Sequence, residues 1–357
     1  MAPLLEEINQ VWAKGLSSRD LVILETSSMV IKENGINFLV RLLKGDGIKR
    51  KGSNIKSQEK RIVDPFAKDT MNQQLVVHSY NDYTLLLNKF PMVLVTNEFM
   101  SQCSPLTQSD FTAITNVISQ VQSLVFFNCG VDSGASQSHK HIQIIPYSEL
   151  ENEATPLDEY LEGTSLDRNS LCQCPVYCFD HVLCHISSYT DPISLYKQYS
   201  DMLQYMSEKR DKKGKSMTSY NFLLLKEWML LVPRIREKWN QLNVNSLGFT
   251  GSILVKNSEA LNSLTSIGPL ELLKHSVEKG IKKVKSTTNH FWKRKSTSDD
   301  SRPPDITDTD VAIAKIKSQK RKINEMLKKS RNECECYKTL AKEELQNNNQ
   351  VFDSYMN

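Results

Sequence analysis

The sequence predicts an α+β protein built on an antiparallel sheet with flanking helices. Short apolar runs of strand length recur between residues 74 and 146, and one run among them, residues 110–121, has the three-and-four spacing of a helix instead. A second pair of strand-like runs follows at residues 222–232. Strands that gather around a helix and are joined by hairpins are typical of α+β folds, in which helices cover the faces of the sheet.

The individual elements follow from local patterns. Residues 4–24 have mainly helical apolar spacing, with Gly15 a predicted stop and Ser17 or Ser18 a predicted cap of a second short segment. Strands are expected at residues 38–43, 75–77, 83–87, 92–95, 124–128, 141–145, 222–225 and 228–232, helices at 110–121 and 191–206, and loops at 44–60 (basic), 149–158 (acidic and flexible) and 209–215 (charged).

Length and composition are ordinary for a globular protein. The chain has 357 residues, of which 39% are hydrophobic and 24% charged, and this length allows more than one domain with a sizeable core. No apolar run is long enough to cross a bilayer, and no basic stretch leads into an apolar one at the N-terminus, so we expect neither a membrane span nor a signal peptide. The eight scattered cysteines indicate reduced thiols. We therefore expect a cytoplasmic or nuclear protein that binds neither a membrane nor nucleic acid.

One short stretch, residues 133–146, carries the strongest chemical signal. Its second half alternates polar and apolar residues, so His139, His141 and Gln143 are predicted on one face of a strand and the residues between them on the other. An isolated His-x-His is more often a structural pair on a wet strand. Here a small, hydroxyl-rich loop, residues 133–138, precedes it and offers backbone N–H groups to an anion. The combination favours attack on a phosphoryl group.

These residues resemble the nucleotidyltransferase branch of the histidine-triad superfamily, in which Gln replaces the third histidine. The resemblance is to the fungal diadenosine tetraphosphate phosphorylases, also called ATP adenylyltransferases, and it extends from the N-terminus to about Val277. The other segments that carry it are residues 87–91, 94–99, 105–107, 110–111, 126–130, 219–224, 228–234, 245–251 and 267–269.

The resemblance implies a fold, a reaction and a set of roles. It implies a histidine-triad-like catalytic domain at residues 1–190 and an ATP adenylyltransferase C-terminal domain at 191–277. The reaction is reversible phosphorolysis of diadenosine tetraphosphate to ATP and ADP, with AMP held covalently on His141. His139 holds geometry or donates a proton, and Gln143 supplies an amide. The implied substrate-binding residues are Asn88, Lys89, Asn128, Gly134, Ala135, Ser136, Gln137, Asn245, Ser246, Leu247 and Lys256.

The expected partners are diadenosine tetraphosphate, ATP, ADP and phosphate, bound by a monomer. No covalent cofactor is expected; Mg²⁺ or another divalent cation would neutralise the polyphosphate, although no dedicated carboxylate cage is visible. Basic residues 49–51 lie where the family places a nucleotide-binding lysine, with no single residue assigned. The cysteines and histidines of residues 172–185 are dense enough for zinc, but their spacing matches no paired ligand framework, and we expect no metal there.

The turn after Pro91 is shorter than in the family that the chain resembles. Pro91 is followed almost at once by strand residues 92–95, and loss of an odd number of residues would swap the faces of that strand. Either the hairpin closes differently or the sequence lacks a few codons. The nucleotide-binding roles implied for Asn88 and Lys89 depend on which of these two explanations of the short turn is correct.

The C-terminal tail differs from the rest of the chain. From His275 onward there are 18 Lys and Arg against 12 Asp and Glu, so the tail carries +6 and the remainder −2 of the total of +4. Residues 278–310 have the composition of a linker, and residues 311–350 the spacing of an amphipathic helix. Residues 306–320 resemble the first helix of an ESCRT-III subunit, and we expect the tail to bind a helical or an acidic partner.

Three alternatives stay open. A dinucleoside polyphosphate hydrolase, or a transferase using adenylyl sulfate or ADP, would use the same nucleophile. A nucleotide-binding protein without turnover would result if the shortened hairpin abolished catalysis. A third reading makes the tail the working part, as an interaction or membrane-remodelling module. The intact His139, His141 and Gln143 argue against the second alternative, and the lack of a second assembly helix argues against the third.

Overall fold

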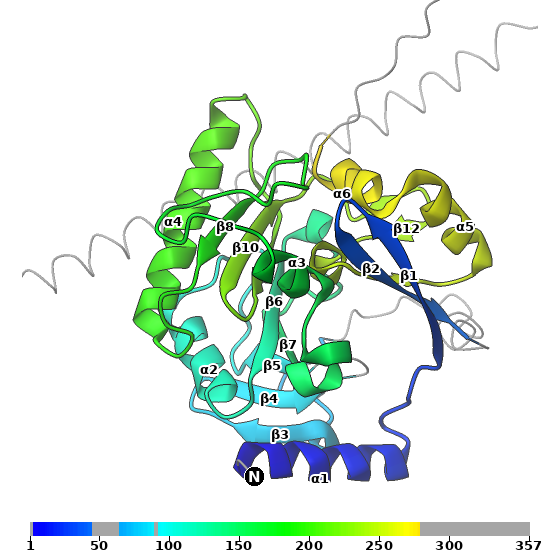
Figure 1. Cartoon of the computed structure of the whole chain (residues 1–357). Coiled ribbons are helices and arrows are strands. Elements are labelled where there is room, and N and C mark those ends of the chain that lie inside the picture. The colour runs from blue at the N-terminus through cyan, green and yellow to red at the C-terminus, as the bar shows by residue number, and fades with distance from the viewer. Residues whose placement is uncertain (1–2, 45–63, 89–91, 279–357) are drawn as a thin grey trace, which may run out of the picture. The chain divides into compact units, whose positions relative to one another are not determined.

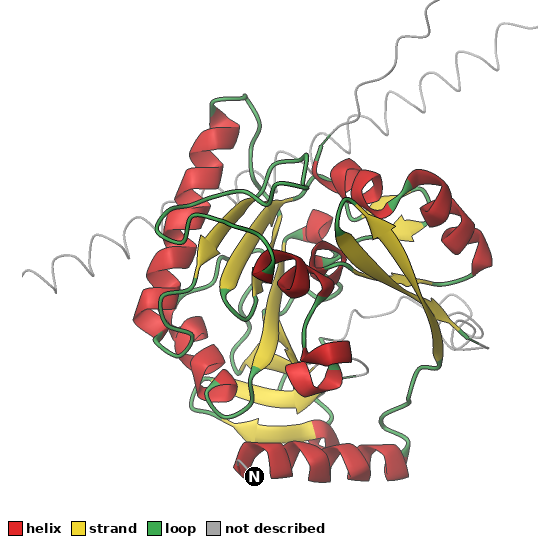
Figure 2. Ribbon diagram, in the orientation of Figure 1, coloured by secondary structure: helices red, strands yellow, loops and turns green. Residues whose placement is uncertain are grey.

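The computed structural model describes residues 3–44, 64–88 and 92–278, which are drawn in colour in Figures 1 and 2. The strands are β1 (Thr26–Glu33), β2 (Ile36–Leu43), β3 (Val76–Ser79), β4 (Tyr83–Leu87), β5 (Met92–Thr96), β6 (Ser123–Cys129), β7 (His141–Pro146), β8 (Val182–His185), β9 (Tyr220–Leu224), β10 (Trp228–Pro233), β11 (Lys238–Trp239), β12 (Leu242–Asn243) and β13 (Ser252–Val255). The helices are α1 (Pro3–Ser18), α2 (Gln108–Ile118), α3 (Pro156–Glu162), α4 (Pro192–Asp211), α5 (Ser258–Ile267) and α6 (Pro269–Val277), and the 3₁₀ turns are η2 (Gln73–Leu75), η3 (Val131–Ser133), η4 (Tyr147–Glu149), η5 (Glu151–Glu153) and η6 (Ser246–Thr250).

The main sheet has the order β3-β4-β5-β7-β6-β9-β10-β8, and every neighbouring pair in it is antiparallel. A smaller sheet has the order β1-β2-β13, with β13 parallel to β2. The α+β fold class is therefore confirmed. Strands from both sides of residue 190 share the main sheet, since β6 pairs with β9, and the domain boundary expected there stays a prediction.

One face of the main sheet is covered by helices, as Figure 1 shows for α2 and α4. Ile142 and Ile144 of β7 are buried in this layer together with Phe111 of α2 and Tyr199 of α4. Helix α2 starts at a capping box, in which the Thr107 hydroxyl accepts from the Asp110 amide and the Asp110 carboxylate accepts from the Thr107 amide. Strand β7 therefore has the predicted alternation, in which every second side chain points to the same face of the sheet.

The opposite face of the main sheet packs on the small sheet and on α3, α5 and α6. Leu124 and Phe126 of β6 share this second core with Phe38 of β2 and Leu273 of α6. The small sheet begins with a hairpin whose turn residues, Asn34 and Gly35, have φ values of 48° and 88°. Positive φ at both central positions is what a tight two-residue hairpin requires. Strand β2 was expected and β1 was not.

The N-terminal segment corrects two expectations. Helix α1 continues through Gly15 to Ser18, and no second helix follows over residues 21–24. Arg19 has a φ of 65°, which ends the helix, and the buried side chain of Leu21 folds back over Gly15. A Cβ on Gly15 would lie 2.8 Å from Leu21 Cδ1, so glycine here makes room for packing rather than stopping the helix.

The other expected strands and helices are present, with ends shifted by a few residues. Helix α4 runs to Asp211, so the charged loop expected at 209–215 begins later. The acidic segment 149–158 contains the last residue of η4, all of η5 and the first turn of α3, which a Thr155–Asp158 capping box starts. The loop at 44–60, Lys89 and the tail from residue 279 lie outside the described residues. Within those residues, no helix is both long and apolar enough to cross a membrane.

Candidate active site

The predicted site residues of β7 lie on the sheet face away from α2 and α4. His141 and Gln143 pair across the ladder with Val95 and Val93 of β5, and the intervening Ile142 packs into the helical layer. Backbone alternation therefore places both polar side chains on the face that turns toward the second core. His139 precedes the strand and forms an isolated bridge with Ser101.

The His141 ring is held in one tautomer by its own strand. Its Nδ1 lies 2.8 Å from the carbonyl oxygen of His139. A carbonyl only accepts hydrogen bonds, so Nδ1 carries the proton and Nε2 keeps its lone pair. Burial lowers the pKa of His141 from 6.5, with the hydrogen bond to His139 opposing the shift. The ring is therefore neutral at pH 7 and has a nucleophilic nitrogen.

The His139 ring is clamped on both nitrogens. Nδ1 lies 2.8 Å from the Asp64 carboxylate, and Nε2 lies 2.8 Å from the Thr96 carbonyl and 3.0 Å from its hydroxyl. His139 is 1% exposed, so its orientation is fixed rather than free to follow a substrate. Neither nitrogen has a lone pair directed to open space. This geometry fits the role of holding the site in place better than that of attack.

An aromatic pair encloses the two imidazoles. The Phe66 ring centroid lies 5.1 Å from that of His141 and 6.2 Å from that of His139. Phe99 lies 5.4 Å from His139 and is 62% exposed. The Asp64 carboxylate accepts from the Phe66 amide, so one short turn supplies both the carboxylate and the ring. Sequence reasoning missed Asp64, whose partner lies 75 residues later.

The strands beside His141 are braced by the buried side chain of Gln102. Its Oε1 accepts from the His141 amide at 2.8 Å, and its Nε2 donates to the carbonyls of Asn128 at 2.8 Å and of His141 at 3.3 Å. The β6–β7 ladder pairs Phe126 with Gln143 but continues no further toward His141. The Gln102 side chain thus forms hydrogen bonds with backbone groups of Asn128 and His141 that have no partner in the β6–β7 ladder, because the ladder ends before them.

The loop predicted to cradle phosphate is shaped by two glycines. Gly130 and Gly134 have φ values of 81° and 89°, on either side of η3. A Cβ on Gly134 would lie 3.1 Å from the Asn245 Cβ and 3.2 Å from the Val244 carbonyl. Glycine is needed here for both the backbone conformation and the close approach. The loop is thereby brought against the segment that begins at Asn245.

A buried polar network joins these two segments. The Asn128 Oδ1 accepts from Asn221 Nδ2 at 2.8 Å, from the Ser246 hydroxyl at 2.7 Å and from the Ser246 amide at 3.2 Å. Asn221 Nδ2 also donates to the Ser133 carbonyl. Asn128 and Ser246, predicted as separate substrate contacts, are therefore hydrogen-bonded to each other. Asn221 was not predicted.

The remaining predicted residues are more dispersed. Asn245 is exposed, and its side chain accepts from the Leu247 amide at the start of η6. Asn88 follows β4 and is half-buried, whereas Lys256 follows β13, in the small sheet, and is exposed. The loop residues differ in exposure: Ser136 is exposed, whereas Ala135 and Gln137 are half-buried.

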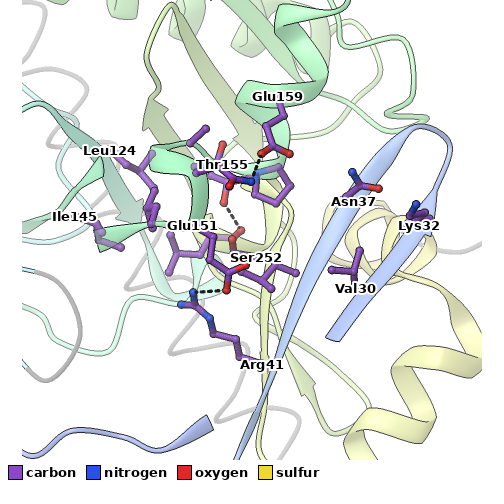
Figure 3. A pocket seen from close by; sticks show the side chains of 17 residues that line it. Val30, Lys32, Asn37, Arg41, Leu124, Ile145, Glu151, Thr155, Glu159 and Ser252 are labelled. Atoms are coloured by element: carbon purple, nitrogen blue, oxygen red, sulfur yellow. Dashed lines mark hydrogen bonds and ion pairs between the residues drawn. The ribbon is translucent and has the colours of Figure 1, made fainter. Parts of the chain in front are cut away.

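A cavity of about 340 Å³ opens between the two sheets on the same face (Figure 3). Ile145 of β7 and Leu124 of β6 form one wall, and Arg41 of β2 reaches across to Glu151, 3.5 Å away. Its lining combines apolar side chains with polar and charged ones, as in pockets that bind small organic ligands with polar groups. The lining residues are Val30, Lys32, Asn37, Leu39, Arg41, Leu124, Ile145, Leu150, Glu151, Asn152, Ala154, Thr155, Pro156, Glu159, Leu247, Thr250 and Ser252.

The cysteine and histidine cluster is engaged in backbone contacts. His181 is fully buried, its Nε2 accepts from the Cys174 amide at 2.7 Å, and its Nδ1 lies 2.8 Å from the Phe179 carbonyl. Both ring nitrogens are thus in use. Cys174 is buried and Cys178 is exposed. In the part of the chain that the structure describes, no three His, Cys, Asp or Glu side chains are placed to hold a metal ion.

The fold and much of the sequence are shared with known proteins. Residues 2–163 match the Ap4A phosphorylase N-terminal domain and residues 175–277 the ATP adenylyltransferase C-terminal domain. The chain is 33% identical over 247 residues to diadenosine 5',5'''-P1,P4-tetraphosphate phosphorylase 2 of Saccharomyces cerevisiae, covering 59% of this chain and 74% of that protein. It is 31% identical over 209 residues to Protein APA1 of the same yeast, covering 51% and 64% of the two chains.

The crystal structures give the same assignment. Yeast Ap4A phosphorylase Apa2 in complex with AMP superposes with a TM-score of 0.61 and 30% identity, over 77% of this chain and 96% of that one. Its complex with Ap4A gives a TM-score of 0.60 and 28% identity, covering 77% and 97%. The fold class is that of a nucleotidyltransferase with a large antiparallel sheet. The chain belongs to the Ap4A phosphorylase (ATP adenylyltransferase) family.

Proposed function

We propose that the chain catalyses the reversible phosphorolysis of diadenosine tetraphosphate, Ap4A, to ATP and ADP. The observation that carries this proposal is the His141 ring, which is neutral, protonated on Nδ1 toward the His139 carbonyl and free to attack through Nε2. It lies on the same face as Gln143 and close in sequence to the glycine-shaped loop at residues 130–137. Membership of the Ap4A phosphorylase family supports the same substrate.

In the first step, His141 Nε2 attacks the α-phosphorus of one adenosyl end of Ap4A. A nitrogen–phosphorus bond forms as the bond from that phosphorus to the bridging oxygen breaks, so ATP leaves and AMP stays on the histidine. The Nδ1–H bond to the His139 carbonyl stabilises the positive charge that develops on the ring. Loop N–H groups and the Gln143 amide would stabilise the charge on the phosphoryl oxygens.

In the second step, an oxygen of inorganic phosphate attacks the adenylyl phosphorus. The nitrogen–phosphorus bond breaks, His141 returns to its neutral form and ADP leaves. Clamped between Asp64 and Thr96, His139 holds the carbonyl that fixes the His141 tautomer, so we assign it a positioning role. A divalent cation such as Mg²⁺ would enter with the polyphosphate and neutralise part of its charge.

The cavity between the sheets is proposed to hold one adenosine. Its volume of about 340 Å³ suits a nucleoside, and Val30, Leu39 and Ile145 offer flat apolar surface to a base. Leu247, one of the predicted nucleotide contacts, lines it. Lys32 at the same cavity adds positive charge for the phosphates that follow the nucleoside, whereas the Arg41 charge there is paired with Glu151.

The test is to incubate the full chain with Ap4A, with and without inorganic phosphate, and to separate the products by chromatography. With phosphate, ATP and ADP should form in equal amounts. Without phosphate, one equivalent of ATP should appear per protein, together with a mass increase equal to one adenylyl group, that is, AMP less water. Formation of AMP and ATP independently of phosphate would identify a hydrolase, and no consumption of Ap4A would leave a nucleotide-binding protein.

A further inference from the structure

Arg234, the residue after β10, is a buried cation that contacts the loop at Ser133 and the segment before Asn245. Its side chain is 2% exposed. Nη1 donates to the Ser133 carbonyl at 3.3 Å and to the Asn221 side-chain oxygen, and Nη2 donates to the carbonyls of Arg236 and Val244, each at 2.8 Å. The guanidinium plane lies 5.4 Å from the ring of Phe249. Neutral oxygens therefore accept all of its hydrogen bonds.

No carboxylate within the described residues forms an ion pair with this guanidinium, and its Nε is buried without a hydrogen-bond partner. Burial lowers the pKa of Arg234 to about 9, against the opposing fields of Asp132 and Glu237. A buried charge is costly unless another charge balances it. A buried cation without an ion pair, beside the loop predicted to bind phosphate, points to a ligand that supplies the balancing charge.

The position of Arg234 indicates which part of the ligand supplies the balancing charge. Ser133 is the first residue of the predicted phosphate-binding loop, and Val244 is followed by Asn245, the first residue of the second predicted nucleotide segment. Through Asn221 the guanidinium also reaches Asn128, which holds Ser246. One side chain thus joins the two segments that are predicted to contact the phosphates.

We propose that Arg234 is a positioning residue for the polyphosphate: it holds the 133–137 loop and the 245–247 segment together and supplies the fixed positive charge that the phosphates of the substrate balance. This inference rests on the proposed function for the identity of the ligand. The guanidinium acts from behind the two backbone segments, so its effect should grow with the number of phosphates and leave recognition of the nucleoside almost untouched.

The experiment measures calorimetric affinities of the full chain for adenosine, AMP and ATP, with Arg234→Gln and Arg234→Lys variants. Arg168→Gln is the matched control, since Arg168 is an exposed arginine paired with Glu227. Arg234→Gln should change the affinity for adenosine by less than about twofold and weaken the affinity for ATP by about tenfold or more. The loss of affinity for AMP should lie between these two values. Arg234→Lys keeps the charge but loses the planar fork, so it should recover most of the ATP affinity while kcat for Ap4A stays low.

Equal losses for adenosine and ATP in Arg234→Gln would show a structural role only and overturn the proposal. Should that variant fail to fold, the lysine variant decides: ATP affinity reduced as strongly as kcat would overturn the proposal, and affinity retained with kcat reduced would support it. Turnover of Ap4A by the wild-type chain tests the proposed function separately. A phosphate-dependent loss of affinity in Arg234→Gln would support the inference even if wild-type turnover were absent.

Discussion

Lys140 Nζ lies 3.0 Å from Oδ2 of Asp110, and both side chains are fully buried. Lys140 stands between the two histidines in the sequence, yet its side chain passes to the helical face of the sheet and also donates to the Pro105 carbonyl at 2.9 Å. Asp110 is the carboxylate of the α2 capping box. The ion pair therefore fixes the strand that carries His141 to the first turn of a helix on the opposite face.

Replacement of Lys140 by Met should destabilise the protein by about 3–5 kcal/mol, because the Asp110 carboxylate would stay buried without its counter-charge. Urea unfolding at pH 7 measures the change. Lys68→Met is the control, since it breaks an exposed pair with Glu98 and should cost less than about 1 kcal/mol. Equal effects of the two substitutions would mean that Lys140 does not balance Asp110.

His141→Asn should abolish phosphorolysis, because an amide nitrogen cannot form the adenylyl bond, whereas the fold should survive with a small loss of stability. Intact-mass measurement with Ap4A in the absence of phosphate should show no AMP adduct. His181→Asn is a matched control: His181 is also buried and makes the same contact with the carbonyl two residues before it. It should lower the melting temperature and leave turnover intact. Retention of an adduct in His141→Asn would move the nucleophile elsewhere.

Gln143→His should shift the products toward hydrolysis. Gln143 lies on the His141 face and is half-buried, so a third imidazole there would be placed to act as general base toward water. With phosphate present, the ratio of AMP to ADP among the products should rise. Gln143→Asn, which has no base, should lower the rate without changing that ratio. An unchanged ratio in the histidine variant would remove residue 143 from the choice of acceptor.

The rate of adduct formation should show an acid limb below pH 6.5. Burial places the pKa of His141 below its ordinary value of 6.5 in the folded protein, so the neutral ring persists to lower pH than an exposed imidazole would. Activity is then full above 6.5 and falls as the pH drops through the lowered value. Single-turnover measurements between pH 4.5 and 8 check this. A midpoint at or above 6.5 would mean that another group limits the step.

Truncation after Glu278 should leave kcat and KM for Ap4A within about a factor of two, because the second family domain ends at Val277 and no described contact of the site involves later residues. Steady-state kinetics of the full and shortened chains, with matched circular dichroism spectra, make the comparison. A large loss of activity in the shortened chain would show that the tail contributes to catalysis.

Local patterns predicted much of this fold, and their limits have a physical cause. The alternation of polar and apolar residues around His141 predicted which side chains share its face of the sheet, because successive side chains of a strand point to opposite faces. Strand β1 was missed although Asn34-Gly35 is a strong hairpin signal. Asp64, Asn221 and Arg234 were missed as site residues because each acts through partners 75 to 101 residues away, which local patterns do not reveal.

The pairing of β6 with β9 has a consequence for how the chain acquires its structure. Nearly a hundred residues separate these neighbours in the sheet, and more than two hundred residues separate β2 from its parallel partner β13. Such distant pairings make folding slow, because the chain loses the entropy of closing a long loop before the strand contacts can form. As the ribosome delivers the chain from its N-terminus, β6 keeps an unpaired and largely apolar edge until the second half arrives. Exposed strand edges of this kind favour aggregation during synthesis, and the cavity between the two sheets is complete only when β13, which carries Ser252 of its lining, has been made.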